Sequence, residues 1–234
     1  MESQPVRPDR GSAPDRIRLA CIDMAGTVVN DGGTVLNAFH CALGAVGVEG
    51  RELDHAMEYA LETMGLSKAV VFKHLLGSDE RVDQALAAFA AAMDEAMKNG
   101  EVSEIPGAAQ VLADLRATGT TVCLTTGFSP EVQRTIIEHL GWQDLVDFVL
   151  APSETLRGRP YPDMVLTAAL RTGIDDVREV AVIGDTTNDL WSGYRAGASA
   201  VVGVLTGSHG RAELERAPHT HILSSILDFP PLAL

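Results

Sequence analysis

Four short segments of the sequence combine acidic, hydroxyl and basic residues with glycine. They read Asp23-Met24-Ala25-Gly26-Thr27, Thr125-Thr126-Gly127, Gly158-Arg159-Pro160 and Gly184-Asp185-Thr186-Thr187-Asn188-Asp189. A carboxylate can attack phosphorus only if the negative charge of the phosphoryl group is masked. A carboxylate set together with hydroxyl groups and a guanidinium is therefore suited to phosphoryl chemistry.

The carboxylates supply the hard oxygen ligands that Mg²⁺ prefers in proteins. Asp23 and Asp185, with a backbone carbonyl near Ala25, are the candidate direct ligands. Asp189 follows Asp185 by four residues, on the same face if a helix begins there, and would hold the metal or its waters. Alone, such a pair at a helix start is usually an N-cap, so the predicted Mg²⁺ site depends on all four segments occurring together.

The other residues of the four segments have roles around a bound phosphoryl group. Thr125 or Thr126, with the free backbone N–H groups beside Gly127, would bind its oxygens. Arg159 would neutralise the nucleophile and the charge that develops during transfer. Gly26 would let the backbone come close.

Short apolar runs precede these segments and predict how they are brought together. The runs are Ile17–Ile22, Thr121–Leu124, Leu145–Leu150 and Val180–Ile183, with a fifth at Ala200–Val204. Helices are predicted between them, at Pro130–Leu140, Pro162–Thr172 and Asn188–Ala196, each followed by a glycine. This alternation predicts an α/β fold whose parallel sheet is covered on both faces, with the site at the carboxyl ends of its strands.

The stretch from Val35 to Asn99 breaks this alternation and reads as helix almost throughout. The predicted helices are Leu36–Val46, Leu53–Met64, Lys68–Leu76 and Arg81–Lys98. A helical block between the first and second strands predicts a cap domain, hinged at Val28–Thr34 and Glu101–Gly107. The expected division is a disordered leader (1–16), a core domain (17–33 and 101–234) and a cap domain (34–100).

Composition restricts the partners of the chain. A formal net charge of −14 over 234 residues argues against a nucleic-acid partner, and no apolar run is long enough for a signal peptide or a membrane span. The three cysteines have no CxxC spacing, which favours a reducing cytoplasm. The expected partner is a small phosphorylated or phosphonate metabolite. The apolar helix Leu36–Val46 either pairs with a second copy in a homodimer or packs inside.

The four segments resemble the motifs of the haloacid dehalogenase (HAD) superfamily, which are DxDxT, Ser/Thr, Lys/Arg and GDxxxD. The resemblance extends from Ile17 to about Gly210. It implies a Rossmann-like core with an inserted helical cap and magnesium as cofactor. It also implies that Asp23 is the nucleophile that becomes an aspartyl phosphate.

One departure narrows the resemblance to the phosphonatase branch. Phosphatases of the superfamily carry a general acid and base, an Asp, two residues after the nucleophile, where this chain has Ala25. The phosphonatase branch shares this change, because its carbanion leaving group is delocalised through a Schiff base on a cap lysine. The segments DMAGT, Met64-Gly65-Leu66-Ser67-Lys68, LTTGF, GRPYPDM and GDTTND all look like that branch. The resemblance places Lys68 at the Schiff-base position and Met64 beside the substrate.

The cap pattern differs from that branch at several positions, so two substrate classes stay open. Glu62-Thr63 replaces a Lys-Pro pair, Val71 replaces a His, and Phe128 replaces a Tyr, although His74 lies one turn after Val71. In one alternative Lys68 forms a Schiff base and the substrate is phosphonoacetaldehyde. In the other Lys68 only binds an anion, and the substrate is a small phosphate monoester such as phosphoglycolate.

Two classes of non-enzymatic protein were also considered. A phospho-accepting receiver domain has a similar Asp, Thr and basic residue, but it is about half this length and has no long helical insertion. A Rossmann nucleotide-binding module requires a glycine-rich turn after its first strand, and DMAGT has no GxGxxG.

Overall fold

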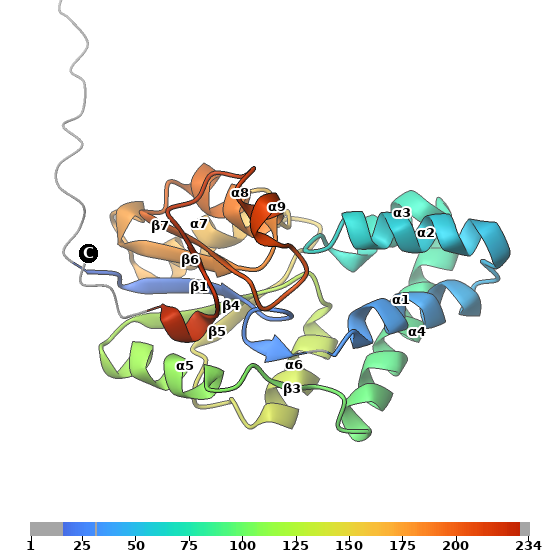
Figure 1. Cartoon of the computed structure of the whole chain (residues 1–234), viewed down its shortest axis with the longest axis horizontal. Helices are drawn as coiled ribbons and strands as arrows, with labels where there is room; N and C mark the ends of the chain where they lie inside the picture. Colours follow the sequence, from blue (N-terminus) through green and yellow to red (C-terminus); the bar gives the residue numbers. More distant parts are fainter. Residues whose placement is uncertain (1–15, 31, 230–234) are drawn as a thin grey trace, which may run out of the picture.

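The computed structural model describes residues 16–30 and 32–229. Its main feature is a six-stranded parallel sheet in the order β5-β4-β1-β6-β7-β8 (Figure 1). The strands are β1 (Leu19–Asp23), β4 (Thr121–Thr125), β5 (Phe148–Leu150), β6 (Val180–Gly184), β7 (Ala200–Val204) and β8 (His221–Leu223). The predicted α/β class with a parallel sheet is confirmed.

The central strands are largely apolar because both faces of the sheet are covered. In β1, Ala20 and Ile22 pack on the face covered by α5 (Ala108–Ala117) and α6 (Pro130–Leu140). Leu19 and Cys21 face the other side, which is covered by α7 (Asp163–Thr172) and α8 (Thr187–Ala196). The described residues end with the short helix α9 (Arg211–Leu214), β8 and a 3₁₀ turn (Ile226–Asp228), after an earlier 3₁₀ turn at Val177–Glu179.

Four helices separate the first strand from the rest of the sheet. They are α1 (Thr34–Ala45), α2 (Gly50–Glu62), α3 (Lys68–Leu76) and α4 (Asp79–Lys98). At their base, β2 (Val29–Asn30) and β3 (Ser103–Glu104) form a two-stranded antiparallel ribbon. The two predicted hinges thus lie side by side (Figure 1). We retain residues 34–100 as the proposed cap domain and call this helical region the cap.

Three phenylalanines form the centre of the cap. The ring centroid of Phe39 lies 5.1 Å from that of Phe72 and 5.2 Å from that of Phe89. All three rings are buried, and Phe128 of the core region approaches Phe89 at 6.2 Å. The apolar face of α1 therefore packs inside the cap, which is the second of the two alternatives left open by the sequence.

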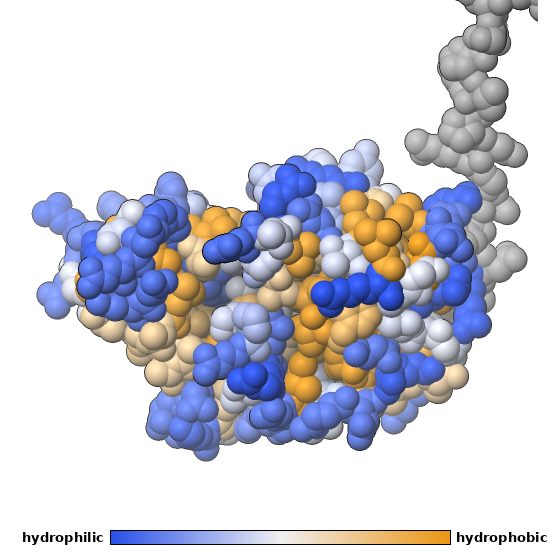
Figure 2. All heavy atoms as spheres, turned by 180° about the vertical axis from the view of Figure 1, so that it is seen from behind, coloured by the Kyte–Doolittle hydropathy of each residue, from blue (hydrophilic) through white to orange (hydrophobic). Residues whose placement is uncertain are grey.

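Several elements differ from the sequence-based expectation. Helices α3 and α6 have the predicted bounds, whereas α5 and the short strands β2 and β3 were not predicted. The predicted disordered leader, apart from Arg16, lies outside the described residues. None of the helices in the described part of the chain is both long and apolar enough to cross a membrane. Figure 2 shows hydrophobic side chains reaching the surface among hydrophilic ones.

Candidate active site

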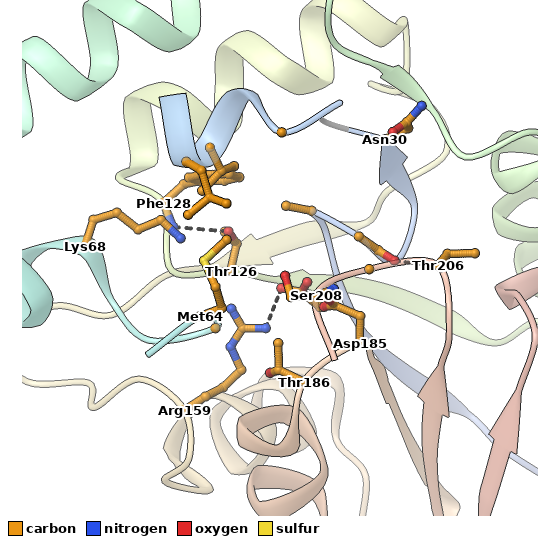
Figure 3. A pocket seen from close by; sticks show the side chains of 18 of the residues that line it. Asn30, Met64, Lys68, Thr126, Phe128, Arg159, Asp185, Thr186, Thr206 and Ser208 are labelled. Atoms are coloured by element: carbon orange, nitrogen blue, oxygen red, sulfur yellow. Dashed lines mark hydrogen bonds and ion pairs between the residues drawn. The ribbon is translucent and has the colours of Figure 1, made fainter. Parts of the chain in front are cut away.

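The carboxyl ends of β1, β4 and β6 bring three of the four sequence segments to one place. Asp23 is the last residue of β1 and lies opposite Thr125 in the register, while Asp185 directly follows β6. Arg159 reaches the same place from the loop after β5. These strand ends form the floor of a cavity of about 270 Å³ (Figure 3).

The cavity is lined by residues from the core region, the hinge and the cap. They are Asp23, Ala25, Gly26, Asn30, Gly32, Gly33, Val35, Leu36, Met64, Gly65, Lys68, Thr126, Phe128, Arg159, Asp185, Thr186, Thr206, Gly207 and Ser208.

The guanidinium of Arg159 forms the central ion pairs of the site. Its Nη1 donates hydrogen bonds to Oδ1 of Asp23 and to Oδ1 of Asp189. The side chains of all three residues are at most 6% exposed. Burial lowers the pKa of Arg159, but the two carboxylates outweigh burial and hold that pKa above its usual range. Arg159 is therefore charged and neutralises part of the buried acid.

Asp189 joins this ion pair to the start of α8. Its Oδ2 accepts hydrogen bonds from the backbone N–H of Thr186 at 3.1 Å and from the Thr186 hydroxyl at 2.5 Å. This is the capping-box arrangement of a helix N-terminus. The capping role that the sequence suggests for this residue and a role in the site are thus combined in one side chain.

Asp185 is held by two loops. Its Oδ2 accepts from the backbone N–H of Ser208 at 2.6 Å, and its Oδ1 accepts from the hydroxyl of Thr27 at 3.5 Å. A Cβ on Gly26 would lie 2.6 Å from Oδ2 of Asp185, and one on Gly207 would lie 2.1 Å from it. Gly26 also has φ +84°, so this position is strained for any other residue. Glycine at position 26 therefore allows Asp185 and the loop at Gly207 to approach the end of β1 closely, while its predicted role beside a phosphoryl group stays a prediction.

The three carboxyl groups create a local excess of negative charge. One oxygen each from Asp23, Asp185 and Asp189 lie within 4.8 Å of one another. Burial raises the pKa of Asp23 well above its usual range, Arg159 opposes this, and the neighbouring carboxylates add to it. Burial and then Asp189 raise the pKa of Asp185 to about 6. The set consists of oxygen ligands only, and a hard divalent cation between them would relieve the excess charge.

The two threonines of the segment Thr125-Thr126-Gly127 lie in different places. Thr126 lines the cavity, whereas Thr125 is paired with Asp23 in the sheet and is not among the lining residues. The hydroxyl of Thr126 accepts from the backbone N–H of Phe128 at 3.1 Å. Gly127 faces the cap, because a Cβ there would lie 2.4 Å from the carbonyl oxygen of Leu66. Of the two threonines, the structure favours Thr126 as the one that reaches a ligand.

The cap contributes Met64, Gly65 and Lys68 to the cavity. Lys68 is 7% exposed, and its Nζ lies 4.7 Å from the ring centroid of Phe128 and 5.9 Å from that of Phe39. Figure 3 shows its side chain reaching towards Phe128 and Thr126. The cavity therefore has an acidic end, around Asp185, and an end near Lys68 that is lined by apolar side chains.

The two cap residues compared with the phosphonatase pattern lie elsewhere. Val71 is buried, and the ring of His74 stacks on Tyr59 at 4.3 Å beside a different cavity on the cap. Among the residues that line the active-site cavity there is no histidine, glutamate or tyrosine. His74 therefore does not replace the missing histidine.

Several lining residues were not singled out from the sequence. Asn30 and Leu36 come from the hinge and the first turns of the cap, and Ser208 comes from the loop after β7. Thr206 lies in the segment Gly203–Gly207, which reads from the sequence as a loop closing the rim of the site. The hydroxyl of Thr206 donates to the carbonyl of Gly26 at 2.6 Å, which closes this loop over the site. The glycine at 207 indicates a loop, but no local signal shows that the loop reaches Asp185.

A family comparison agrees with this geometry. The profile of the haloacid dehalogenase-like hydrolases matches residues 21–203, which include the four motif segments of the candidate site and the whole cap, but not the loop at Thr206–Ser208. The chain belongs to this family, and it is a hydrolase.

The similar proteins have names that describe two different activities. Over 205 residues the chain is 29% identical to the "Probable phosphatase IndB" of Dickeya dadantii, covering 85% of this chain and 86% of that protein. Over 107 residues it is 35% identical to phosphonoacetaldehyde hydrolase of Bacillus thuringiensis, covering 45% of this chain and only 40% of that protein. A solved phosphonoacetaldehyde hydrolase like protein from Oleispira antarctica has the same fold, with TM-score 0.77, 22% identity and coverage of 94% and 92%.

Asp185 gives a pH-dependent stability prediction for the metal-free protein. Its pKa is about 6, against 3.8 for the ordinary carboxyl. The folded state therefore binds this proton more tightly than the unfolded state, and the free energy of unfolding falls as the pH rises from about 4 to above 6. This penalty is about 3 kcal/mol at pH 7.5 and roughly half of that at pH 5. Chelator-treated Asp185→Asn should thus melt at a higher temperature than wild type at pH 7.5, with a smaller difference at pH 5.

Asp163→Asn is the control with the opposite sign, because Arg157 lowers the pKa of that partly buried carboxyl. Melting of all three proteins is followed by circular dichroism. A wild type more stable than Asp185→Asn at pH 7.5 would contradict the prediction.

Proposed function

We propose that the chain is a magnesium-dependent hydrolase that transfers a phosphoryl group to the carboxylate of Asp23 and then to water. The observation that carries the proposal is one shared cavity, lined by Asp23 and Arg159 from the core region and by Lys68 from the cap. Its volume of about 270 Å³ suits a small metabolite. Thr126 and the backbone near Gly127 would bind phosphoryl oxygens. The Nε of Arg159 is buried without a hydrogen-bond partner in the described structure, and a ligand oxygen would provide one.

The donor set fits magnesium. Asp23, Asp185 and the backbone carbonyl of Ala25 would be direct ligands, and Asp189 would act from the second layer, because its oxygens already bind Thr186 and Arg159. Bound Mg²⁺ would mask the phosphoryl charge that otherwise repels a carboxylate nucleophile. Arg159, which already pairs with Asp23, would stabilise the charge that develops on the transferred group.

For the substrate we favour phosphonoacetaldehyde, with Lys68 as the covalent partner. The lining residues with titratable side chains are Asp23, Asp185, Arg159 and Lys68. With Ala25 in place of an acid, Lys68 is the titratable side chain that the described part of the cap offers to the leaving group. Its amine would condense with the aldehyde, releasing water. When Asp23 attacks phosphorus, the electron pair of the broken P–C bond enters the iminium and gives an enamine. Protonation and hydrolysis then release acetaldehyde and regenerate Lys68, while hydrolysis of the aspartyl phosphate releases phosphate.

The alternative is a phosphatase that acts on a small phosphate monoester such as phosphoglycolate. The similarity along most of the chain to the Dickeya dadantii protein supports it. In this case Lys68 would bind the anionic group of the substrate, and the leaving alkoxide would take its proton from water. A phospho-accepting receiver domain is disfavoured, because the cavity is built jointly by the core region and a four-helix cap.

The first prediction concerns the nucleophile. Asp23→Asn should abolish turnover, because an amide cannot form the acyl phosphate, and the loss should approach the whole covalent contribution. Phosphate release is measured with phosphonoacetaldehyde and with phosphoglycolate, and circular dichroism checks the fold. Substantial activity in a folded variant would rule out Asp23 as the nucleophile.

The second prediction concerns the metal. Activity should be lost on chelation, restored by Mg²⁺ and poorly restored by Zn²⁺, because no lining residue is a histidine or cysteine. Asp185→Ala should weaken Mg²⁺ binding, measured by titration calorimetry, more than Asp189→Ala does. Full activity after exhaustive chelation would contradict the prediction.

The third prediction separates the two substrate classes. If Lys68 forms an imine, borohydride added with phosphonoacetaldehyde should inactivate the enzyme, and mass spectrometry should find the reduced adduct on Lys68. Lys68→Arg should then be inactive, because a guanidinium keeps the charge but forms no Schiff base. We expect this outcome.

Ala25→Asp is the companion variant for the same question. In a phosphatase the new carboxyl supplies the missing acid and should raise turnover of a phosphate ester, whereas in a phosphonatase it should not help. An active Lys68→Arg with a raised KM, no trapped adduct and a faster Ala25→Asp would establish the phosphatase alternative.

A further inference from the structure

The cap contacts the core region through the loop that carries Lys68. This segment, residues 63–68, consists of the connection between α2 and α3 and of Lys68, the first residue of α3. We call it the cap loop. It lies between two core segments, the one that follows β4 and the one that begins α8. Both of these segments also belong to the candidate site.

Two hydrogen bonds fix the cap loop on either side of its centre. The side-chain Nδ2 of Asn188 donates to the carbonyl of Met64 at 2.8 Å. The backbone N–H of Lys68 donates to the carbonyl of Gly127 at 3.2 Å. Because Lys68 is the first residue of α3, these bonds determine where that helix begins and where its amine enters the cavity.

Glycine is required where the loop and the core region meet. A Cβ on Gly127 would lie 2.4 Å from the carbonyl oxygen of Leu66 and 3.4 Å from Cα of Ser67, so its nearest neighbours all belong to the cap loop. A Cβ on Gly65 would lie 2.5 Å from the hydroxyl of Thr186. The fit is therefore close on both sides.

We infer that Asn188 is a positioning residue, which holds Lys68 in the cavity through the carbonyl of Met64. Gly127 is the matching surface on which the cap loop rests. Asn188 does not line the cavity, and its neighbour Asp189 makes the contacts to Arg159. The start of α8 thus contributes to both features: Asp189 pairs with Arg159, and Asn188 donates a hydrogen bond to the cap loop. The expected effect on turnover rests on the proposed function, whereas the effect on the loop does not.

Lysine acylation provides a test that needs no substrate. The sequence has three lysines, Lys68, Lys73 and Lys98. Lys68 is 7% exposed, whereas the side chains of Lys73 and Lys98 are 53% and 65% exposed. Acetic anhydride labelling, followed residue by residue by mass spectrometry, should modify Lys68 only when the cap loop leaves the core region. Lys73 and Lys98 are internal controls on the same cap.

Asn188→Ala should raise the rate of Lys68 labelling about two- to tenfold, the effect of one hydrogen bond on the opening equilibrium, and leave Lys73 and Lys98 unchanged. Asn99→Ala is the matched control, because the side-chain Nδ2 of Asn99 donates to exposed Glu101, far from the cap loop, and its loss should leave Lys68 unchanged. Gly127→Ala should raise Lys68 labelling at least as much. Gly44→Ala, where a Cβ meets nothing within 4 Å, should not. Unchanged Lys68 labelling in folded Asn188→Ala and Gly127→Ala would overturn the inference.

A double-mutant cycle tests whether Asn188 acts through Lys68. Asn188→Ala should lower kcat/KM for phosphate release, yet add little further loss to Lys68→Ala. Additive losses would overturn the positioning role. If Lys68→Ala itself leaves turnover intact, the proposed function fails at Lys68, and the labelling result still decides the inference about the loop.

Discussion

The structure of the site depends on one buried cation, the guanidinium of Arg159 between Asp23 and Asp189. Buried carboxylates are costly unless they are paired, and this chain places three within 4.8 Å of one another at the end of its sheet. Arg159 neutralises part of that charge from the loop between β5 and α7. Because Asp189 also caps α8, the guanidinium connects the end of β1, the loop after β5 and the start of a helix. The charge that remains is what a bound cation would balance.

The sequence was most informative where local patterns and burial agree. The strands of the sheet centre were predictable because Leu19 and Ala20 meet opposite helical layers, which makes the run apolar at every position. Proline and glycine gave the bounds of α6, since Pro130 suits a first turn and Gly141 adopts the left-handed conformation at its end. The ribbon at the hinge has two residues in each strand, too few for any periodicity. Helix α5 was not predicted, because the strand before it belongs to that ribbon and is too short to be recognised in the sequence.

The types of residue that form the site could also be predicted from the sequence, but the contacts between these residues could not. The motifs identified the acids and the arginine, because the carboxyl ends of parallel strands lie at one edge of a sheet. The cap lysine was identified by the resemblance of its segment to the phosphonatase branch. Adjacent residues at a strand end point in different directions, so the pair Thr125-Thr126 could not be resolved without the fold. Asn188 and Met64 are 124 positions apart, and nothing in the sequence indicates that they bond. The segment Gly203–Gly207 reads as a loop at the rim of the site, but the bonds of Thr206 to Gly26 and of Ser208 to Asp185 could not be predicted.

In the proposed function, catalysis is divided between two parts that must meet. The core region holds the acids and Arg159, and the cap supplies Lys68 to the cavity. With alanine at position 25, the chain lacks the acid that phosphatases of the superfamily carry two residues after the nucleophile. The cap loop rests on Gly127, next to Thr126, and on the helix start that contains Asp189. A ligand that orders these two core segments would therefore also stabilise the surface that receives Lys68. By thermodynamic reciprocity, a seated cap would strengthen the binding of that ligand, and turnover would depend on the contact between the cap and the core region.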